Sequence, residues 1–209
     1  MNQDSTHKRQ RGRGPLGREK IKQSLISLLA KKEFSAITTA EIAKNAGVTE
    51  ALIYKYFKDK RDLLHQVLSE YMEQFQAEVE HGLRGIKGAL NKLRKVIWLH
   101  IYVYATNRVF AKILLLEVRN YPEFFTSHAY ELVRKYSNIV LAIIDEGIEA
   151  GEIRSDLPPR TLRQSILGCI EQACLTEIIF DRAISPDDLS EDLCEFVFNG
   201  LTHPRSHTA

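Results

Sequence analysis

The chain has 209 residues, of which 44% are hydrophobic and 27% are charged, a composition typical of a soluble globular protein. The longest apolar run, 139–144, is far shorter than the roughly 20 residues of a membrane-spanning helix, so we expect no such helix. The basic N-terminus lacks the apolar stretch of a secretion signal, and three cysteines without CxxC spacing favour reduced thiols in a cytoplasm.

The net charge of +2 conceals an asymmetry along the chain. Up to Leu64, fourteen Lys and Arg residues stand against seven Asp and Glu residues, a net charge of +7. The remainder has 15 basic and 20 acidic residues, a net charge of −5. This division indicates that the N-terminal part meets a polyanion and that the rest does not. An uneven surface without functional meaning is the alternative.

The first predicted elements are an arm and a helix. Residues 1–16 are polar and basic without apolar periodicity, so we expect a disordered arm there. From Arg18, apolar residues recur at helical spacing and predict a helix to about Lys32. They are Ile21, Leu25, Leu28 and Leu29.

Two short helices joined by a glycine turn are predicted next. Thr38 followed by Glu41 is a capping box, in which each side chain accepts from a free amide at the start of a helix. Gly47 ends that helix, because glycine enters a left-handed turn at low cost. Thr49 then caps a third helix over residues 50–56. Two such helices form a helix-turn-helix.

The rest of the chain predicts further helices. Asp59 and Asp62 signal the start of a fourth helix, which has no Gly or Pro before Glu80. Helical periodicity then continues to a break at Tyr121-Pro122. Further helices are expected from about Glu123 to Gly151, over 161–180 and over 186–201. No strand periodicity stands out, so we expect an all-α fold of about nine helices. Its expected parts are a disordered basic arm over 1–16, a helix-turn-helix domain over 17–64 and a helical domain over 65–209.

The segment 37–64, ITTAEIAKNAGVTEALIYKYFKDKRDLL, resembles the DNA-binding signature of the tetracycline-repressor (TetR) family of bacterial regulators. The residues in register are Thr38-Thr39, Ile42-Ala43, Ala46-Gly47-Val48, Tyr54, Tyr56-Phe57, Lys60 and Leu63-Leu64. With the preceding helix, the resemblance covers about a quarter of the chain. The rest carries no comparable signature, as is usual in a family whose C-terminal domains vary with their ligands.

The pattern of the third helix agrees with a role in DNA binding. Leu52, Ile53 and Phe57 are apolar and should pack onto the first two helices. The residues left to project outward are Thr49, Glu50, Ala51, Tyr54 and Lys55. In a helix-turn-helix, the N-terminal part of the second helix contacts base edges in the major groove.

Individual contacts follow from side-chain chemistry. Lys55 can donate to guanine or to a phosphate, and Ala51 or the methyl group of Thr49 can meet a thymine methyl. Glu50 either accepts from cytosine N4 or faces solvent. The arginines of the arm either enter a minor groove or belong to a solubility tail.

The resemblance implies phosphate contacts around these base contacts. Tyr54 and Tyr56 would reach phosphates on either side of the groove, as the family's equivalents do. The amide and the ammonium of Lys60, in the first turn of the fourth helix, suit one phosphate, aided by the helix dipole. Thr38 and Thr39 would hold the other backbone. Packing is the alternative for Tyr56, and capping alone is the alternative for Thr38.

The resemblance further implies a homodimer on a pseudo-palindromic operator, with half-sites roughly 34–36 Å apart. The dimer would form through the last two helices as a four-helix bundle, with intrachain packing as the alternative for each candidate residue. The interface candidates are Leu162, Ile166, Cys169, Ile170, Leu193, Val197 and Gly200.

The resemblance also implies that a small-molecule effector binds between helices four and seven. The pocket candidates are Trp98, Tyr102, Phe110, Phe124, Phe125 and Tyr130, with His100, Glu117 and Arg119 as polar contacts. Plain core packing is the more frequent role of such aromatic residues. The apolar content favours a lipophilic effector.

We therefore expect a cytoplasmic, dimeric, sequence-specific regulator, most simply a repressor released by a small ligand. Nucleophile, metalloprotease, P-loop and dinucleotide motifs are absent from the sequence, and we expect no enzymatic activity, cofactor or metal. One alternative is a helical protein that binds a small molecule and has only non-specific affinity for DNA. A helical enzyme or adaptor is another, for which no residue can be nominated.

Overall fold

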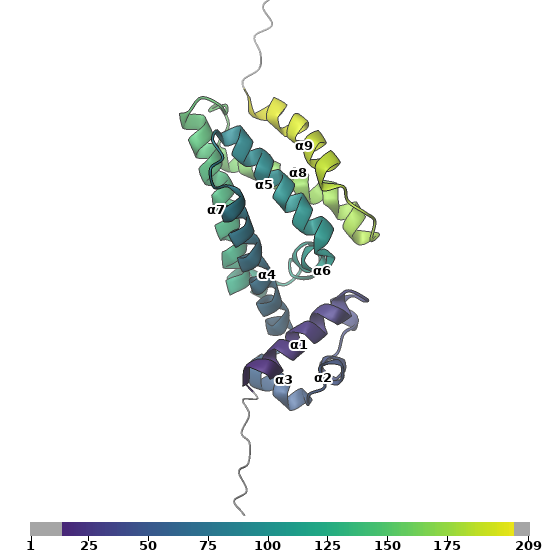
Figure 1. The fold of residues 1–209 in the computed structure, drawn as a ribbon. Helices are drawn as coiled ribbons and strands as arrows, with labels where there is room; N and C mark the ends of the chain where they lie inside the picture. The colour runs from purple at the N-terminus through teal and green to yellow at the C-terminus, as the bar shows by residue number, and fades with distance from the viewer. Residues whose placement is uncertain (1–13, 203–209) are drawn as a thin grey trace, which may run out of the picture. The chain divides into compact units, whose positions relative to one another are not determined.

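A computed structural model describes residues 14–202, and the regular elements within that range are all helical, which confirms the all-α prediction (Figure 1). The chain separates into two compact units, Met1–Val67 (unit 1) and Leu68–Ala209 (unit 2). This boundary lies three residues beyond the expected one. Arg9, Arg11 and Arg13 of the expected arm lie outside the described residues, and a helix already begins at Gly14.

Unit 1 consists of short helices followed by the start of a long one. Its elements are α1 (Gly14–Leu29), the 3-10 turn η1 (Phe34–Ala36), α2 (Thr39–Ala46), α3 (Glu50–Tyr56) and the first residues of α4 (Lys60–Gly82). The predicted stop of α2 is confirmed, since Gly47 has a φ of 64°. The predicted start of α4 is also confirmed. Asp59 Oδ1 accepts from the Asp62 amide at 2.8 Å, and Asp62 Oδ2 accepts from the Lys58 amide at 2.9 Å.

The core of unit 1 forms because each helix turns one apolar face inward. Ile21 and Leu25 of α1, Ile42 of α2 and Ile53 of α3 have no exposed surface. Phe57, which follows α3, is 1% exposed. Full burial of such side chains stabilises a fold by about 1.5–3 kcal/mol each. Burial therefore fixes the rotation of α3 about its own axis.

Unit 2 contains the remainder of α4 and the later helices. These are α5 (Ala89–Thr106), α6 (Arg108–Lys112), the π-helical segment η2 (Ile113–Glu117), the 3-10 turn η3 (Pro122–Thr126), α7 (His128–Glu149), α8 (Pro159–Ile179) and α9 (Pro186–Leu201). The break at Tyr121-Pro122 is confirmed. The long helix expected from Glu123 starts later, because the Ser127 hydroxyl caps α7 by accepting from the Tyr130 amide at 3.3 Å.

Helix α5 is the centre of unit 2 and packs against α7, α8 and α9. Its residues Leu93, Val96 and Ile101 have no exposed surface. Gly147 of α7 allows a close approach, since a Cβ there would lie 2.5 Å from Ile153 and 2.7 Å from Ala89. Within residues 14–202, no helix is long and apolar enough to cross a membrane.

Candidate functional site

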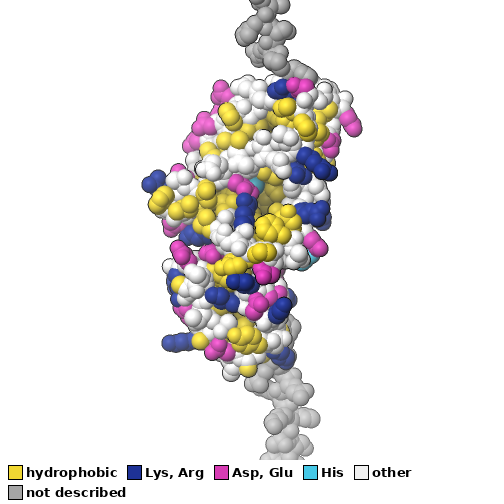
Figure 2. Space-filling view, turned by 180° about the vertical axis from the view of Figure 1, so that it is seen from behind, with side chains coloured by type: hydrophobic (Ala, Val, Ile, Leu, Met, Phe, Trp, Pro, Cys, Tyr) yellow, Lys and Arg dark blue, Asp and Glu magenta, His cyan; other side chains and the backbone are white. Residues whose placement is uncertain are grey.

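The exposed face of α3 carries the residue types that the sequence placed there. Ile53 and Phe57 are buried, and Leu52 is half-buried. The side chains left in solvent are Thr49, Glu50, Ala51, Tyr54 and Lys55. Tyr54 is 56% exposed although it is large and aromatic. On the face of unit 1 visible in Figure 2, Lys and Arg side chains are interspersed with Asp and Glu side chains.

A chain of polar contacts joins the start of α3 to the start of α2. The Thr39 hydroxyl donates to Glu50 Oε2 at 2.9 Å, and the Tyr54 hydroxyl donates to Thr39 Oγ1 at 3.5 Å. The sequence left Glu50 open between reading a cytosine and facing solvent. Here its carboxylate accepts a hydrogen bond from the neighbouring helix, so three of the candidate DNA-contacting residues form one cluster.

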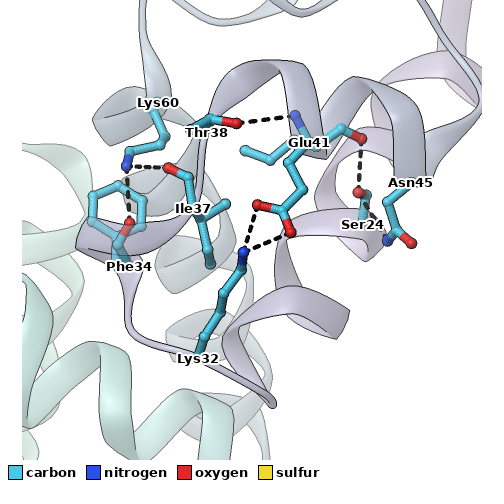
Figure 3. A network of polar contacts seen from close by, with 9 residues as sticks. Ser24, Lys32, Phe34, Ile37, Thr38, Glu41, Asn45 and Lys60 are labelled. Carbon is cyan, nitrogen blue, oxygen red and sulfur yellow. Dashed lines mark hydrogen bonds and ion pairs between the residues drawn. The ribbon is translucent and has the colours of Figure 1, made fainter.

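A second polar network holds α2 against α1 (Figure 3). The Thr38 hydroxyl accepts from the Glu41 amide at 3.2 Å, which confirms the predicted cap. The Glu41 carboxylate accepts from the Lys32 ammonium at 2.6 Å, and this hydrogen bond is the main reason that its pKa is lowered. The Ser24 hydroxyl donates to the Ile42 carbonyl at 2.8 Å, so α2 is tied both to α1 and to the segment that follows α1.

Lys60 points into unit 1 in this structure. Its ammonium donates to the carbonyl oxygens of Phe34 at 2.8 Å and Ile37 at 2.5 Å, and it lies 4.3 Å from the centre of the Phe34 ring (Figure 3). The sequence predicted a phosphate contact for this side chain. The structure gives the ammonium a different use, because η1 presents two carbonyl oxygens beside the first turn of α4.

Tyr56 is half-buried, so both of its predicted roles remain compatible with its position. Its ring lies edge-on to Phe57 with centroids 6.4 Å apart, and the Lys55 ammonium is 5.9 Å from the Tyr56 centroid. Packing thus orients the ring, and the ring lies beside a basic side chain that belongs to the exposed face of α3.

Unit 2 contains a small internal cavity of about 70 Å³. Its lining comes from α4, α5, α6, η2, α7 and α8 and is mostly apolar. The lining residues are Met72, Phe75, His100, Phe110, Leu114, Val133, Tyr136, Ser137, Leu167 and Glu171. Ligand pockets usually enclose roughly 300–1,000 Å³, so this cavity is closed around very little space.

His100 and Tyr136 line this cavity and are buried, whereas Glu171, which also lines it, is partly exposed. His100 Nδ1 and the Tyr136 hydroxyl share a hydrogen bond at 3.0 Å. Burial lowers the pKa of His100 to about 4, so its imidazole is neutral near pH 7. Arg119 and Glu171 form a two-pronged ion pair at 2.6 and 2.8 Å. The Tyr104 hydroxyl, also fully buried, has no hydrogen-bond partner in the described part of the chain.

Of the six aromatic pocket candidates, the structure brings only Phe110 to this cavity. Trp98 and Tyr102 stack on each other with centroids 4.9 Å apart, and the Trp98 indole donates to Asp187 Oδ1 of α9 at 2.6 Å. The other three candidates form a separate aromatic cluster around η3. They are Phe124, Phe125 and Tyr130. His100 and Glu171 line the cavity, whereas five of the six aromatic candidates do not. The sequence predicted His100 as a polar contact but did not indicate Glu171.

The dimer candidates divide between core and surface. Leu162, Ile166, Ile170 and Val197 are buried within the single chain. Cys169 and Leu193 are partly exposed, and Gly200 is exposed. The sequence interpretation missed Phe196, which is 70% exposed. Phe196 borders a surface hollow of about 450 Å³ on α8 and α9. Its lining is Leu157, Leu162, Ser165, Ile166, Cys169, Phe196, Val197, Asn199, Gly200 and Leu201.

Comparisons with known proteins agree with this division into two parts. Residues 24–67 match the family "Bacterial regulatory proteins, tetR family", and residues 68–200 match "YsiA-like protein, C-terminal region". The fatty acid metabolism regulator protein of Bacillus subtilis is 31% identical over 181 residues, which are 87% of this chain and 93% of that protein.

Solved structures of other proteins have a similar fold. The transcriptional regulator FadR of Bacillus subtilis, in complex with stearoyl-CoA, is similar with a TM-score of 0.79 and 31% identity, over 88% of this chain and 98% of that one. FadR of Bacillus halodurans, a fatty acid degradation regulator, has a TM-score of 0.80 over 92% of this chain and 100% of that one. Its identity of 24% supports the similarity of fold alone.

The inward position of Lys60 leads to a prediction about stability. Lys60→Met keeps the aliphatic stem and removes the donor, so we expect the free energy of unfolding to fall by about 1–2 kcal/mol. Urea denaturation measures this loss. Lys58→Met is the matched control, because Lys58 is exposed, and its effect should stay within about 0.5 kcal/mol. A Lys60→Met protein with unchanged stability but weaker DNA binding would support the predicted phosphate contact instead.

Burial of His100 predicts a pH dependence of stability. The unfolded chain binds a proton at His100 below its ordinary pKa of 6.5, whereas the folded chain does so only below about 4. Stability should therefore fall as the pH is lowered from 6.5 to 4, by roughly 3 kcal/mol. Denaturation of His100→Gln over this range should lack that contribution. The exposed residue His81 provides the control, and His81→Gln should keep the wild-type slope.

Proposed function

Because this chain belongs to the tetR family of bacterial regulatory proteins, we propose that unit 1 reads an operator through the exposed face of α3. The protein is a ligand-responsive, DNA-binding transcriptional regulator. We further propose that it is a cytoplasmic repressor of fatty acid metabolism genes, without enzymatic activity. Its similarity to the Bacillus subtilis regulator over nearly the whole of both chains carries this proposal.

The proposed base contacts come from the N-terminal part of α3. Ala51 is exposed there beside Thr49, Lys55 is exposed in the last turn of the same helix, and both are free to approach base edges. The cluster of Thr39, Glu50 and Tyr54 holds the flank of this face in place. In the complex with DNA, the hydroxyls of Thr39 and Tyr54 would exchange this internal bonding for phosphate oxygens.

Tyr56 and Thr38 are proposed to contact phosphates at the edges of the same face. Thr38 keeps its capping role, since one hydroxyl oxygen accepts from the Glu41 amide while its proton remains available to a phosphate. Lys60 is proposed to act indirectly, by holding η1 and the start of α2 in position through its two carbonyl contacts.

The proposed effector is a long-chain acyl-CoA. The Bacillus subtilis relative was solved with stearoyl-CoA, and the cavity of unit 2 has the apolar lining that an acyl chain needs. At about 70 Å³ the cavity is too small for such a chain, so binding must select or induce an expanded state. Helix α4 contributes Met72 and Phe75 to this cavity and Lys60 to unit 1. Movement of α4 is therefore the proposed link between effector and DNA.

A homodimer is proposed because a single helix-turn-helix makes too few base contacts for a specific site. The exposed Phe196 and the apolar hollow on α8 and α9 provide a surface that a second copy would cover. Gly168 and Gly200 leave open space on these helices, since a Cβ at either position would meet no atom within 4 Å. Close approach of two backbones is possible there.

Operator binding is tested by fluorescence anisotropy with duplexes from the gene's own upstream region. We expect binding by two chains per duplex, salt-dependent and stronger than to scrambled DNA. Lys55→Ala should reduce the preference for the operator, with a loss of about 1–3 kcal/mol if it contacts a base. Lys87→Ala, an exposed lysine of unit 2, is the control.

Two outcomes of this experiment would change the proposal. Equal affinity for operator and scrambled duplexes would favour a ligand-binding protein with only non-specific affinity for DNA. Phe196→Glu should weaken operator binding because the dimer is lost. If this variant keeps the wild-type stoichiometry and affinity, the proposed dimer interface at Phe196 is wrong.

The effector is tested by adding stearoyl-CoA to the preformed complex with DNA. We expect release of the duplex at low micromolar concentrations or below, and a matched acetyl-CoA titration should leave the complex intact because a two-carbon chain buries little apolar surface. Retention of DNA at saturating stearoyl-CoA, with operator binding otherwise specific, would keep the regulator and reject the acyl-CoA effector.

A further inference from the structure

A polar groove of about 400 Å³ runs between α7 and α8, which pack against each other within unit 2. The residues from α7 follow helical spacing, as do those from α8, so each helix contributes one continuous stripe. The lining residues are Tyr130, Val133, Arg134, Ser137, Asn138, Leu141, Arg160, Arg163 and Gln164. This groove is on a different side of α8 from the apolar hollow, which uses Ser165 and Cys169.

Among the described residues, three arginines line this groove and no carboxylate does. Within residues 14–202, Arg134, Arg160 and Arg163 make no side-chain hydrogen bond or ion pair with the protein. The Arg163 Nε atom is buried and has no hydrogen-bond partner in that range. Other arginines of unit 2 are engaged, as Arg119 is with Glu171 and Arg154 with Asp156. The groove therefore concentrates positive charge that the described protein leaves unneutralised.

Two of these arginines lie where a positive charge is unfavourable. Arg160 and Arg163 lie at the start of α8, whose first turn has no acidic residue and whose N-cap, Pro158, offers no side-chain hydrogen bond. Cations at a helix N-terminus oppose the helix dipole, whereas anions are stabilised there. An anion in the groove would satisfy the free guanidinium donors and the dipole together.

The groove also borders the internal cavity. Val133 and Ser137 line both, the groove on one side and the apolar cavity on the other. A ligand that joins an anionic head to an apolar tail would therefore place its head among the arginines and pass its tail between Val133 and Ser137. Free coenzyme A has only the head, and a free fatty acid has the tail with one carboxylate.

We propose that Arg134, Arg160 and Arg163 form the binding site for the phosphate groups of the acyl-CoA effector. This assignment rests on the proposed function for the identity of the effector. Arginine suits it because the planar guanidinium binds phosphate oxygens in pairs, and several guanidinium groups match the several phosphates of coenzyme A. Affinity for the effector then depends on salt, whereas affinity for the apolar tail does not.

Isothermal titration of stearoyl-CoA, stearate and coenzyme A into the full chain tests this site. Arg134→Gln, Arg160→Gln and Arg163→Gln should each weaken stearoyl-CoA binding by about 10-fold or more, and leave stearate binding unchanged. Arg163→Lys keeps the charge and should lose less than Arg163→Gln. The control is Arg84→Gln, which removes an exposed arginine of unit 2 outside the groove and should bind all three compounds as wild type.

The effect on DNA release provides a second readout. The groove variants should bind operator DNA with wild-type affinity, which also verifies that they are folded, but should need about 10-fold more stearoyl-CoA to release it. If their loss of stearoyl-CoA affinity does not exceed that of Arg84→Gln, the groove assignment is overturned and the proposed effector stands. Equal losses for stearate and stearoyl-CoA would also overturn it, in favour of a carboxylate site.

Failure of the effector itself has a different signature. In that case the wild-type chain neither binds stearoyl-CoA nor releases DNA with it. Titration of inorganic pyrophosphate and coenzyme A then tests whether the groove binds phosphate. Binding by the wild-type chain that is weaker in the glutamine variants would support a phosphate site there. Absence of binding by both probes would overturn the site together with the effector.

Discussion

The exposed face of α3 depends on the burial of Ile53 and Phe57. A helix of seven residues has little stability of its own in water, so its orientation comes from the apolar side chains that it inserts into unit 1. Once these two are buried, helical geometry dictates that Ala51, Tyr54 and Lys55 face outward. The operator contacts proposed for Ala51, Tyr54 and Lys55 follow from this rotation. The hydrogen bonds of Lys60 and Thr39 act on the same arrangement, because they fix the segments on which α3 rests.

Burying polar groups in the interior of unit 2 costs free energy, and hydrogen bonds between those groups offset part of this cost. His100 and Tyr136 are both removed from solvent, and their shared hydrogen bond offsets part of the desolvation cost. The ion pair between Arg119 and Glu171 joins the end of η2 to α8. The cavity beside them has a volume of about 70 Å³, and the nearby Tyr104 hydroxyl has no hydrogen-bond partner in the described part of the chain. An effector that fills the space would supply the apolar contacts that the ligand-free packing lacks.

Sequence reasoning succeeded where the cause is local. Thr38, Gly47 and Asp59 acted as cap, stop and start signals because each satisfies or releases backbone groups within a few residues. It failed where distant segments meet. Nothing near Lys60 in the sequence indicates that two carbonyl oxygens of η1 lie beside its ammonium. Trp98 and Tyr102 looked like pocket residues by composition, yet they lie on the side of α5 towards α9, because Asp187 accepts from the indole.

The sequence by itself determined the helical fold, the helix-turn-helix and the outward face of α3, since apolar periodicity and capping residues act over one or two turns. Only the tertiary structure decided which side chains share a cavity. It brought His100, Tyr136 and Glu171 together from three helices, and it placed Arg134 opposite Arg160 and Arg163. These groupings depend on how α5, α7 and α8 cross, and a crossing is set by the summed packing of many side chains that no short stretch of sequence encodes.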